Sequence, residues 1–401
     1  MRRDLIGETL LGQFRVETFL AAGGMATIYR VWDLQRSVPL AMKVLHPELA
    51  GDPAFITRFQ REARSLELLV HPHIVPFYGL YRAGDLTFLL ERYIDGPSLD
   101  EVLRRRNGQP LRLSEALVYF KALYTSLGYA HARGIIHCDV KPGNVLIDQG
   151  GAVYLTDFGI ARFADGSSTT SSAIGTPYYM APEQILGEPV AAQTDIYSLG
   201  VLMFELLTGR RPFLGDAGAP PAMGGSTSDR VRYQHLTQPP PDPRSLNPAL
   251  PPGVAQVILT ALAKDPRQRY PSVQVMAAEL ARAVGARFET LPDRVSLADL
   301  LGPAPAWPAR PSAEGAAGIH PPDALPPTDT QPGQVYAVPP AAAGRREGRR
   351  SPARWLAALG VLAGVVLCAL AGFGLLRALQ AGLPGFPGRL TVPASATAPA
   401  V

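Results

Sequence analysis

The stretch that decides the fold of this chain reads Gly-Ile-Ile-His-Cys-Asp-Val-Lys-Pro-Gly-Asn-Val-Leu-Ile and runs from residue 134 to residue 147. A second stretch, Leu-Thr-Asp-Phe-Gly, follows at residues 155–159. In both stretches, apolar residues of the kind that form short buried strands lie beside polar residues that strands do not need. These polar residues are therefore the first candidates for chemistry.

Several of these polar residues offer oxygen atoms. Asp139 is a candidate proton acceptor. Asn144 and Asp157 supply oxygen ligands of the kind that Mg²⁺ prefers. Lys141 adds a positive charge two residues after Asp139. Turn-forming residues between strands would explain each of them separately, but not their joint order with two charged residues upstream.

The two upstream residues are Lys43 and Glu62. Lys43 lies in the run 40–44, where alternating Leu, Met and Val predict a strand. From Phe55 the apolar period becomes that of a helix, and Glu62 shares one face of this helix. A lysine in a strand is ordinarily solvated, but this one has apolar neighbours. The order allows a Lys43–Glu62 pair that directs the ammonium group at phosphates.

A glycine-containing segment joins two predicted strands near the N-terminus. The strands are Phe14 to Leu20 and Ile28 to Trp32, and Gly23 and Gly24 lie between them. These glycines let the backbone approach a phosphate closely, although a hairpin turn with no ligand gives the same pattern. The segment has neither the P-loop pattern nor that of a dinucleotide-binding turn. The candidate nucleotide contacts are Leu20, Ala21, Ala22, Gly23, Gly24, Met25, Ala26, Thr27 and Ile28.

The remaining pattern predicts an α+β fold, strand-rich first and helix-rich later. Apolar runs at residues 86–90 and near Tyr93 are expected to complete a small antiparallel sheet. Helices are expected from an N-cap at Ser114 through His131, and over residues 195–208.

The ordered motifs resemble those of a protein kinase, specifically a eukaryotic-type (Hanks-type) Ser/Thr kinase of the bacterial membrane-anchored kind, over about residues 14–284. The resemblance implies a bilobal kinase fold, with a small antiparallel-sheet N-lobe carrying one helix and a helical C-lobe. The matching segments are the Gly-rich loop at residues 23–29, the V-A-I-K strand at 41–43, the catalytic loop at 137–139, the magnesium loop at 157–159 and Ala-Pro-Glu at 181–183.

The resemblance implies roles in phosphoryl transfer. Asp139 would accept the proton of the substrate hydroxyl, and Lys141 would stabilise the transferring γ-phosphoryl group. Lys141, in Asp-Val-Lys-Pro-Gly-Asn, and Thr176, in Gly-Thr-Pro-Tyr-Tyr-Met, are typical of the Ser/Thr class. The implied partners are protein substrates with serine or threonine acceptors.

Other residues would hold the nucleotide. Asn144 and Asp157 would bind magnesium ions. Lys43, tied to Glu62, would contact the α- and β-phosphates, and the backbone of the glycine-containing segment would cover the nucleotide. The implied cofactors are ATP and Mg²⁺, with Mn²⁺ as an alternative metal.

Three further residues match structural positions of the family. Asp195, in Asp-Ile-Tyr-Ser-Leu-Gly, matches the start of the large central helix of the C-lobe. Arg269 matches the arginine that pairs with the glutamate of Ala-Pro-Glu, which is Glu183 here.

The chain departs from the family pattern at several positions. Ala21 and Ala26 stand where loop glycines are expected. Cys138 replaces the arginine of His-Arg-Asp, so the usual grip on a phosphorylated activation segment is absent. Behind the adenine, the pattern leaves Leu90 and Glu91 as alternatives.

Two functions are compatible with this pattern: an active kinase, or a pseudokinase-like module that recruits partners to the membrane. Five catalytic positions of the family are filled, and a binding module has no chemical need for all of them: Lys43, Glu62, Asp139, Asn144 and Asp157. The pattern therefore favours the enzyme. A hydroxyl-rich run at residues 167–172 leads us to expect autophosphorylation.

Composition limits the other functions. Lys and Arg total 38 against 34 for Asp and Glu, and no basic run lies within 14–284, so we expect no nucleic-acid partner. Two distant cysteines, Cys138 and Cys368, exclude a disulfide scaffold and a zinc cluster. Proline, alanine and glycine accumulate at 285–354, which predicts a juxtamembrane linker.

Residues 355–376 carry no charge and would span about 33 Å as a helix, which matches a hydrocarbon core of about 30 Å. A buried core helix is the alternative, but its flanks offer no fold to bury it. Arginines concentrate upstream of the segment, which favours a cytoplasmic kinase domain at the cell membrane. Residues 377–401 would then form a short extracytoplasmic tail.

Small residues recur every four positions in this segment, at Gly360, Gly364, Cys368 and Gly372. Such a stripe lets two helices approach closely and predicts a homodimer through the membrane helix. An Ala- and Gly-rich composition produces the same spacing by chance, so both alternatives stay open.

Overall fold

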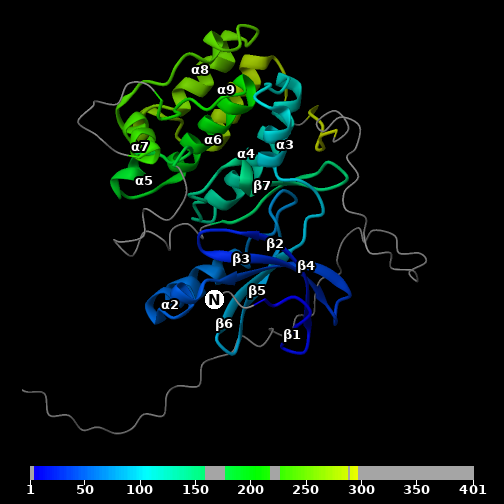
Figure 1. Ribbon diagram of the computed structural model, residues 1–401. Helices are drawn as coiled ribbons and strands as arrows, with labels where there is room; N and C mark the ends of the chain where they lie inside the picture. Colours follow the sequence, from blue (N-terminus) through cyan, green and yellow to red (C-terminus); the bar gives the residue numbers. More distant parts are fainter. Residues whose placement is uncertain (1–3, 159–176, 217–225, 288–289, 297–401) are drawn as a thin grey trace, which may run out of the picture. The chain divides into compact units, whose positions relative to one another are not determined.

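The computed structural model describes residues 4–158, 177–216, 226–287 and 290–296 (Figure 1). All of them belong to one unit of the chain, Met1–Ser312. In Figure 1 the strands β1–β6 lie in the blue part of the ribbon, and helices α3–α9 follow in the cyan to yellow part. The predicted passage from a strand-rich to a helix-rich region is confirmed.

The N-lobe is a six-stranded antiparallel sheet in the order β1-β2-β3-β4-β6-β5. Alternate residues of β3 are buried, which places Tyr29 and Val31 in the core under one face of the sheet. Leu5 and Leu10 join this core, so the described N-lobe begins ahead of Phe14. The strands are β1 Thr9–Leu10, β2 Phe14–Ala22, β3 Ala26–Asp33, β4 Val38–Leu45, β5 Phe77–Ala83 and β6 Leu86–Arg92.

The strands expected at residues 14–20, 28–32, 40–44 and 86–90 are confirmed, but the one expected near Tyr93 is wrong. The sixth strand is β5, which pairs with β6 through the register Leu80↔Leu89 and Tyr81↔Phe88. Strand β6 ends at Arg92, and it is paired with β4 on one edge and with β5 on the other.

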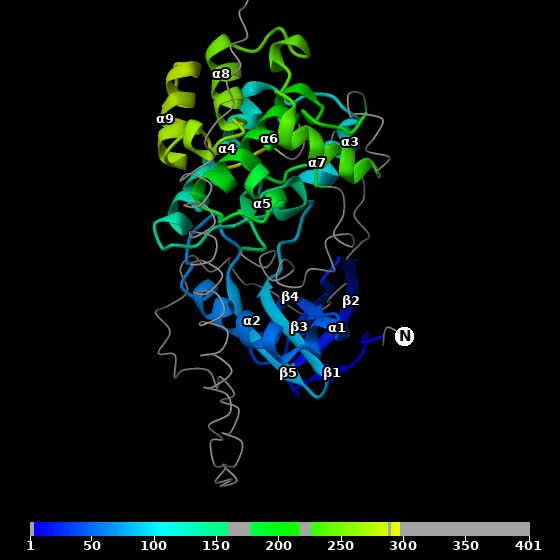
Figure 2. The ribbon, with the colours of Figure 1, turned by 90° about the vertical axis from the view of Figure 1, so that its left-hand side faces the viewer.

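Helix α2, Pro53–Leu66, covers the opposite face of this sheet, after the short helix α1, Pro47–Ala50 (Figure 2). The carboxylate of Asp52 accepts hydrogen bonds from the backbone N–H groups of Ala54 and Phe55, and this cap starts the helix. Phe55 and Phe59 stack with their ring centroids 5.7 Å apart and pack on Leu45 and Leu89. The contact between α2 and the sheet is therefore made by apolar side chains.

The C-lobe is built around α4 and α6. Helix α6 begins three residues earlier than predicted and ends where Gly209 takes φ +75°, a conformation that favours glycine. The predicted N-cap of α4, Ser114, is wrong: it lies inside the first turn, and the N-cap residue is Arg112. The carboxylate of Glu115 accepts the backbone N–H of Arg112 at 3.0 Å, which stabilises this earlier start.

Short helices and one hairpin complete the C-lobe. The hairpin β7–β8 carries the catalytic loop on one side and the magnesium loop on the other. The elements are α3 Leu99–Arg106, α4 Leu113–His131, η1 Pro142–Asn144, β7 Val145–Ile147, β8 Val153–Leu155, α5 Pro182–Leu186, α6 Ala192–Thr208, α7 Thr227–Thr237, η3 Pro243–Ser245, α8 Pro252–Ala261, η4 Pro266–Gln268 and α9 Val273–Val284.

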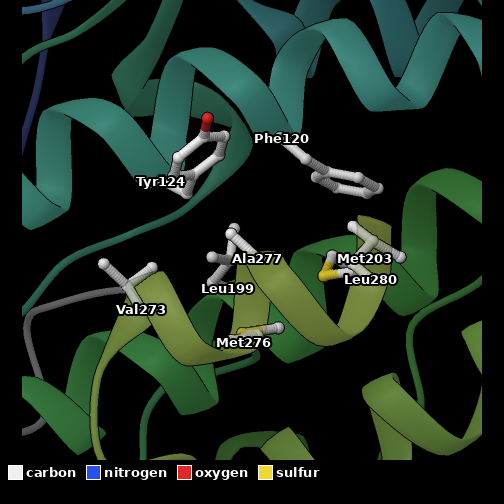
Figure 3. A pocket seen from close by; sticks show the side chains of 8 residues that line it. All are labelled: Phe120, Tyr124, Leu199, Met203, Val273, Met276, Ala277 and Leu280. Atoms are coloured by element: carbon white, nitrogen blue, oxygen red, sulfur yellow. The ribbon is translucent and has the colours of Figure 1, made fainter. Parts of the chain in front are cut away.

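An apolar pocket lies between α4, α6 and α9 (Figure 3). Figure 3 shows Phe120 and Tyr124 of α4 across from side chains of α9. The side chains that line this pocket carry no charge, so it offers no means of binding phosphate. The other lining residues are Leu199, Met203, Val273, Met276, Ala277 and Leu280.

After α9 the chain returns to the C-lobe. The ammonium group of Lys121 donates to the backbone oxygen of Leu291 at 2.7 Å and pairs with Asp293 at 2.6 Å. Val295 is buried, and its N–H donates to the oxygen of Gly151 at 2.8 Å. Packing against the lobe thus extends past the end of α9.

Within the described parts of the chain, no helix combines the length and the apolar character required to cross a bilayer. The predicted span at 355–376, the tail at 377–401 and most of the predicted linker lie outside the described residues. So do Gly159, Thr176 and the hydroxyl-rich run at 167–172.

Candidate active site

Asp195 holds the start of the catalytic loop. Its carboxylate is fully buried and accepts the backbone N–H groups of His137 and Cys138, each at 2.8 Å. The imidazole of His131 lies 2.7 Å from the same carboxylate. These bonds hold Cys138 at φ +66°, an uncommon conformation for a residue with a side chain. Asp195 therefore sets the backbone from which Asp139 projects.

Three side chains that the sequence singled out converge at Asp139. The ammonium group of Lys141 donates to Oδ2 of Asp139 at 2.7 Å. The amide nitrogen of Asn144 donates to the same oxygen at 2.9 Å and to the backbone oxygen of Asp139 at 2.8 Å. About a third of the Asp139 side chain stays exposed, so a substrate hydroxyl has access to it.

His137 joins the catalytic loop to the magnesium loop. Its Nδ1 accepts the backbone N–H of Asp139 at 3.1 Å, so Nε2 carries the proton and donates to the backbone oxygen of Thr156 at 2.8 Å. Its ring lies 4.5 Å from the ring of Phe158, centroid to centroid. His137 thus places Asp157 relative to Asp139.

The ammonium group of Lys43 lies against Asp157, across the two lobes. It donates to a carboxylate oxygen of Asp157, to Oε2 of Glu91 at 2.7 Å and to the hydroxyl of Thr156 at 3.3 Å. Burial alone would lower the pKa of Lys43, but the negative charges of Asp157 and Glu91 outweigh it and raise the pKa. Lys43 is therefore charged.

The same ion pair acts on Asp157, which stands at φ +65°. Burial favours its neutral form, but the charge of Lys43 outweighs this effect, and the pKa of Asp157 is lowered. Asp157 is thus ionised, as a metal ligand must be.

Glu62 lies in α2, but its side chain is outside the described part of the structure. The Lys43–Glu62 pair therefore stays a prediction. The choice between Leu90 and Glu91 as the residue behind the adenine also stays a prediction, but the structure shows where each side chain lies. Leu90 is buried in the N-lobe core, and Glu91 faces the Lys43 ammonium group.

The glycine-containing segment forms the turn between β2 and β3. The N–H of Gly23 donates to the oxygen of Ala26 at 2.9 Å and closes the turn. In the sheet register Ile28 lies opposite both Ala21 and Lys43, so these three side chains share one face. Thr27 is buried on the other face. Of the candidate nucleotide contacts, Ala21 and Ile28 thus lie on the lysine's face.

A buried ion pair anchors the end of the activation segment. Arg269 donates to both carboxylate oxygens of Glu183, at 2.7 and 2.9 Å, so the pair expected from the sequence is present. Burial would raise the pKa of Glu183, but bonds from Arg269 and from the Thr194 hydroxyl lower it. The amide of Gln184 donates to the oxygen of Cys138 at 2.8 Å, which ties this segment to the catalytic loop.

The site suits a magnesium ion held partly by phosphates. Among the residues described, no group of three or more His, Cys, Asp or Glu side chains forms a metal site. Magnesium needs only one or two carboxylates when a nucleotide supplies the other ligands. Asn144 donates through its amide nitrogen, which leaves the amide oxygen for a ligand, and Asp157 meets Lys43 through one of its two oxygens. These two residues therefore fit the ion.

Sequence reasoning missed Thr156 and Gln184, and it named Glu91 only as a candidate residue behind the adenine and not as a partner of Lys43. Only Glu91 had a local signal, because it is a charged residue at the end of an otherwise apolar strand. Thr156 and Gln184 act through contacts with residues distant in the sequence, at Glu91 and Cys138.

Comparison with known proteins agrees with this geometry. Residues 14–280 match the protein kinase domain, and the chain belongs to this family. The crystal structure of the kinase domain of Mycobacterium tuberculosis PknI has the same fold, with a TM-score of 0.56 and 28% identity. The similarity covers 70% of this chain and 98% of that one.

Among curated relatives, serine/threonine-protein kinase PrkC of Bacillus subtilis is 37% identical over 284 residues, 70% of this chain. Serine/threonine-protein kinase PknA of M. tuberculosis is 39% identical over 274 residues, 67% of this chain. PknB of Mycolicibacterium smegmatis is 36% identical over 362 residues, 88% of this chain. The matches span only 42%, 60% and 53% of the lengths of these relatives.

Proposed function

We propose that the protein is a Ser/Thr protein kinase that transfers the γ-phosphoryl group of ATP to serine or threonine hydroxyls of proteins. The observation that carries the proposal is the convergence of Lys141 and Asn144 on the carboxylate of Asp139, a cluster tied by His137 to the Lys43–Asp157 pair. The relatives named as Ser/Thr protein kinases support the same acceptor class.

The chemistry follows from these positions. The substrate oxygen forms a bond to the γ-phosphorus, the bond from that phosphorus to the β–γ bridging oxygen breaks, and ADP leaves. Asp139 accepts the hydroxyl proton as the new bond forms, and Lys141 neutralises charge on the transferring group. Lys43 orients the α- and β-phosphates. When bound by Asn144 and Asp157, Mg²⁺ (or Mn²⁺) would neutralise charge on the phosphates.

The alternative is a pseudokinase-like membrane scaffold. It is less well supported because the ionic groups are oriented as well as present: Asp139 receives two side-chain donors, and Asp157 is held ionised by Lys43. A protein that only bound partners through this fold would gain nothing from that arrangement.

Labelled phosphate transfer from ATP by the full chain, in detergent or vesicles with Mg²⁺ or Mn²⁺, tests the proposal. We expect incorporation into the protein itself and into a generic basic substrate. Asp139→Asn should remove it, and Arg104→Gln, a change at an exposed residue of α3, is the matched control. No incorporation by the unchanged protein would favour the scaffold.

We also propose that residues 355–376 anchor the protein in the cell membrane, with the kinase domain on the cytoplasmic side and residues 377–401 outside. The uncharged composition of the segment and the arginines ahead of it support this topology. Deletion of 355–376 should move the protein from the membrane fraction to the soluble fraction. If the protein that lacks residues 355–376 stays in the membrane fraction, the proposed role of this segment as the anchor is wrong.

The stripe of small residues in the same segment supports a homodimer. Leucine at Gly360 and Gly364 should reduce self-association in a membrane reporter assay and slow autophosphorylation of the full chain. Unchanged association would show that the spacing results from composition.

A further inference from the structure

Glu91 is a buried carboxylate beside the nucleotide site, and none of the kinase motifs above includes it. It stands at the end of β6, with only 7% of its side chain exposed. Its Oε2 accepts hydrogen bonds from the Lys43 ammonium group at 2.7 Å and from the Thr156 hydroxyl at 2.9 Å. A buried carboxylate is costly unless it is paired, so this position needs a reason.

Backbone pairing fixes the Lys43–Glu91 pair. In the register of β4 and β6, Ala41 lies opposite Glu91 and Lys43 lies opposite Leu89. The two charged side chains therefore share one face and are diagonal neighbours on adjacent strands. Helix α2, which carries Glu62, is attached to this sheet through apolar side chains and can shift without breaking strand pairing. Glu91 and Lys43 lie on paired strands of the sheet itself, so a shift of α2 does not separate them.

The donors of Lys43 are shared among three acceptors. The acceptors are Glu91, Thr156 and Asp157, and the ammonium group has three hydrogens, one for each acceptor. An incoming phosphate competes with Asp157 for Lys43, because Asp157 is also the metal ligand. Glu91 and Thr156 can keep their bonds while this exchange takes place. Burial raises the pKa of Glu91, and the charge of Lys43 opposes that effect.

We propose that Glu91 is a positioning residue, which holds the Lys43 ammonium group at the phosphates from the sheet itself, whatever the position of α2. The inference rests on the proposed kinase function, since it concerns the lysine that would contact ATP. Thr156 supports Glu91 by donating to the same oxygen.

The test compares the affinities of the full chain for ATP and for adenosine, together with kcat and KM for ATP. Adenosine has no phosphates, so a change in Lys43 should leave its binding unaffected. We expect Glu91→Gln to weaken ATP binding and to lower kcat/KM for ATP by about tenfold or more. Adenosine affinity should stay within about twofold. The substitution removes a charged hydrogen bond to Lys43, which adenosine does not contact through phosphates, and it keeps the size of the side chain.

The same measurements on Glu62→Gln compare the two glutamates, and Glu279→Gln, at a partly exposed residue of α9, is the matched control. We expect Glu91→Gln to cost at least as much as Glu62→Gln. In a Lys43→Met background, Glu91→Gln should have no further effect on ATP affinity, because its action passes through the lysine.

Three results would overturn the proposal: equal weakening of ATP and adenosine by Glu91→Gln, a change below about threefold in ATP affinity, or a full effect in the Lys43→Met background. If Glu91→Gln does not fold, Thr156→Val decides by the same ratio, with an expected loss of about threefold for ATP alone. If the unchanged protein binds ATP but transfers no phosphate, the proposed function fails, and the affinity ratio still tests Glu91.

Discussion

Replacing Arg269 by alanine should destabilise the kinase domain severely. The side chain of Arg269 is fully buried, and that of Glu183 is 3% exposed. Arg269 also donates to the backbone oxygens of Ala263, Gln193 and Lys264. The change therefore leaves a buried carboxylate with no cation and three backbone acceptors with one donor fewer.

The structure sets the size of this effect. Removing one partner of a buried ion pair costs about 3–5 kcal/mol, because the other charge stays buried. For domains of this size class about 2–4 °C of melting temperature is lost per kcal/mol, so Arg269→Ala should lower the Tm by about 6–20 °C. Arg269→Lys keeps the charge but not the bidentate hydrogen bonding to both oxygens of Glu183. The Tm of this variant should lie between those of the unchanged protein and Arg269→Ala.

Thermal unfolding followed by circular dichroism or scanning fluorimetry measures the effect. Arg267→Ala is the matched control, since the Arg267 side chain is 90% exposed and the residue lies in the short helix η4, which ends immediately before Arg269. We expect no measurable change in Tm for this control. A shift for Arg269→Ala no larger than that of Arg267→Ala would refute the reasoning, because the buried pair would then contribute nothing.

Three further outcomes are expected. Lys43→Met and Asp157→Asn should each abolish phosphoryl transfer in the fraction of protein that is folded, and Lys43→Met should also lower the Tm because the buried Glu91 carboxylate loses its cation. Transfer within tenfold of the unchanged protein in either variant would contradict their roles. A chain ending at residue 290 should melt below one ending at 296, because it loses buried Val295, worth about 1.5–3 kcal/mol; equal Tm values would contradict this docking. Burial lowers the pKa of His235 from 6.5 to about 3. As the pH drops, the unfolded chain therefore binds this proton before the folded chain does. The free energy of unfolding falls by about 1.4 kcal/mol per pH unit between these two pKa values. Urea unfolding of His235→Gln should show a flatter dependence between pH 6.5 and 4, and an unchanged slope would exclude His235 as its source.

The sequence by itself was sufficient for the elements with a clear period and for the motifs with a fixed order. Strands β2, β3 and β4 and helix α6 follow from alternation and from the spacing of apolar residues. The catalytic loop could be found because Asp139, Lys141 and Asn144 lie within six residues, so their meeting needs only a local loop. Arg269 and Glu183 are far apart, and only the family resemblance predicted their pair.

Tertiary structure decided the rest, because it depends on pairing between distant segments. Strand β5 lacks a clean alternation and becomes a strand by pairing with β6. Val295 is buried only because its segment meets Gly151, where a side-chain carbon would lie 2.0 Å from the Val295 oxygen. Glu91 and Lys43 are 48 residues apart and become neighbours through the register of β4 and β6. A one-residue slip would turn Glu91 to the other face, so no local pattern could have named it as the partner of Lys43.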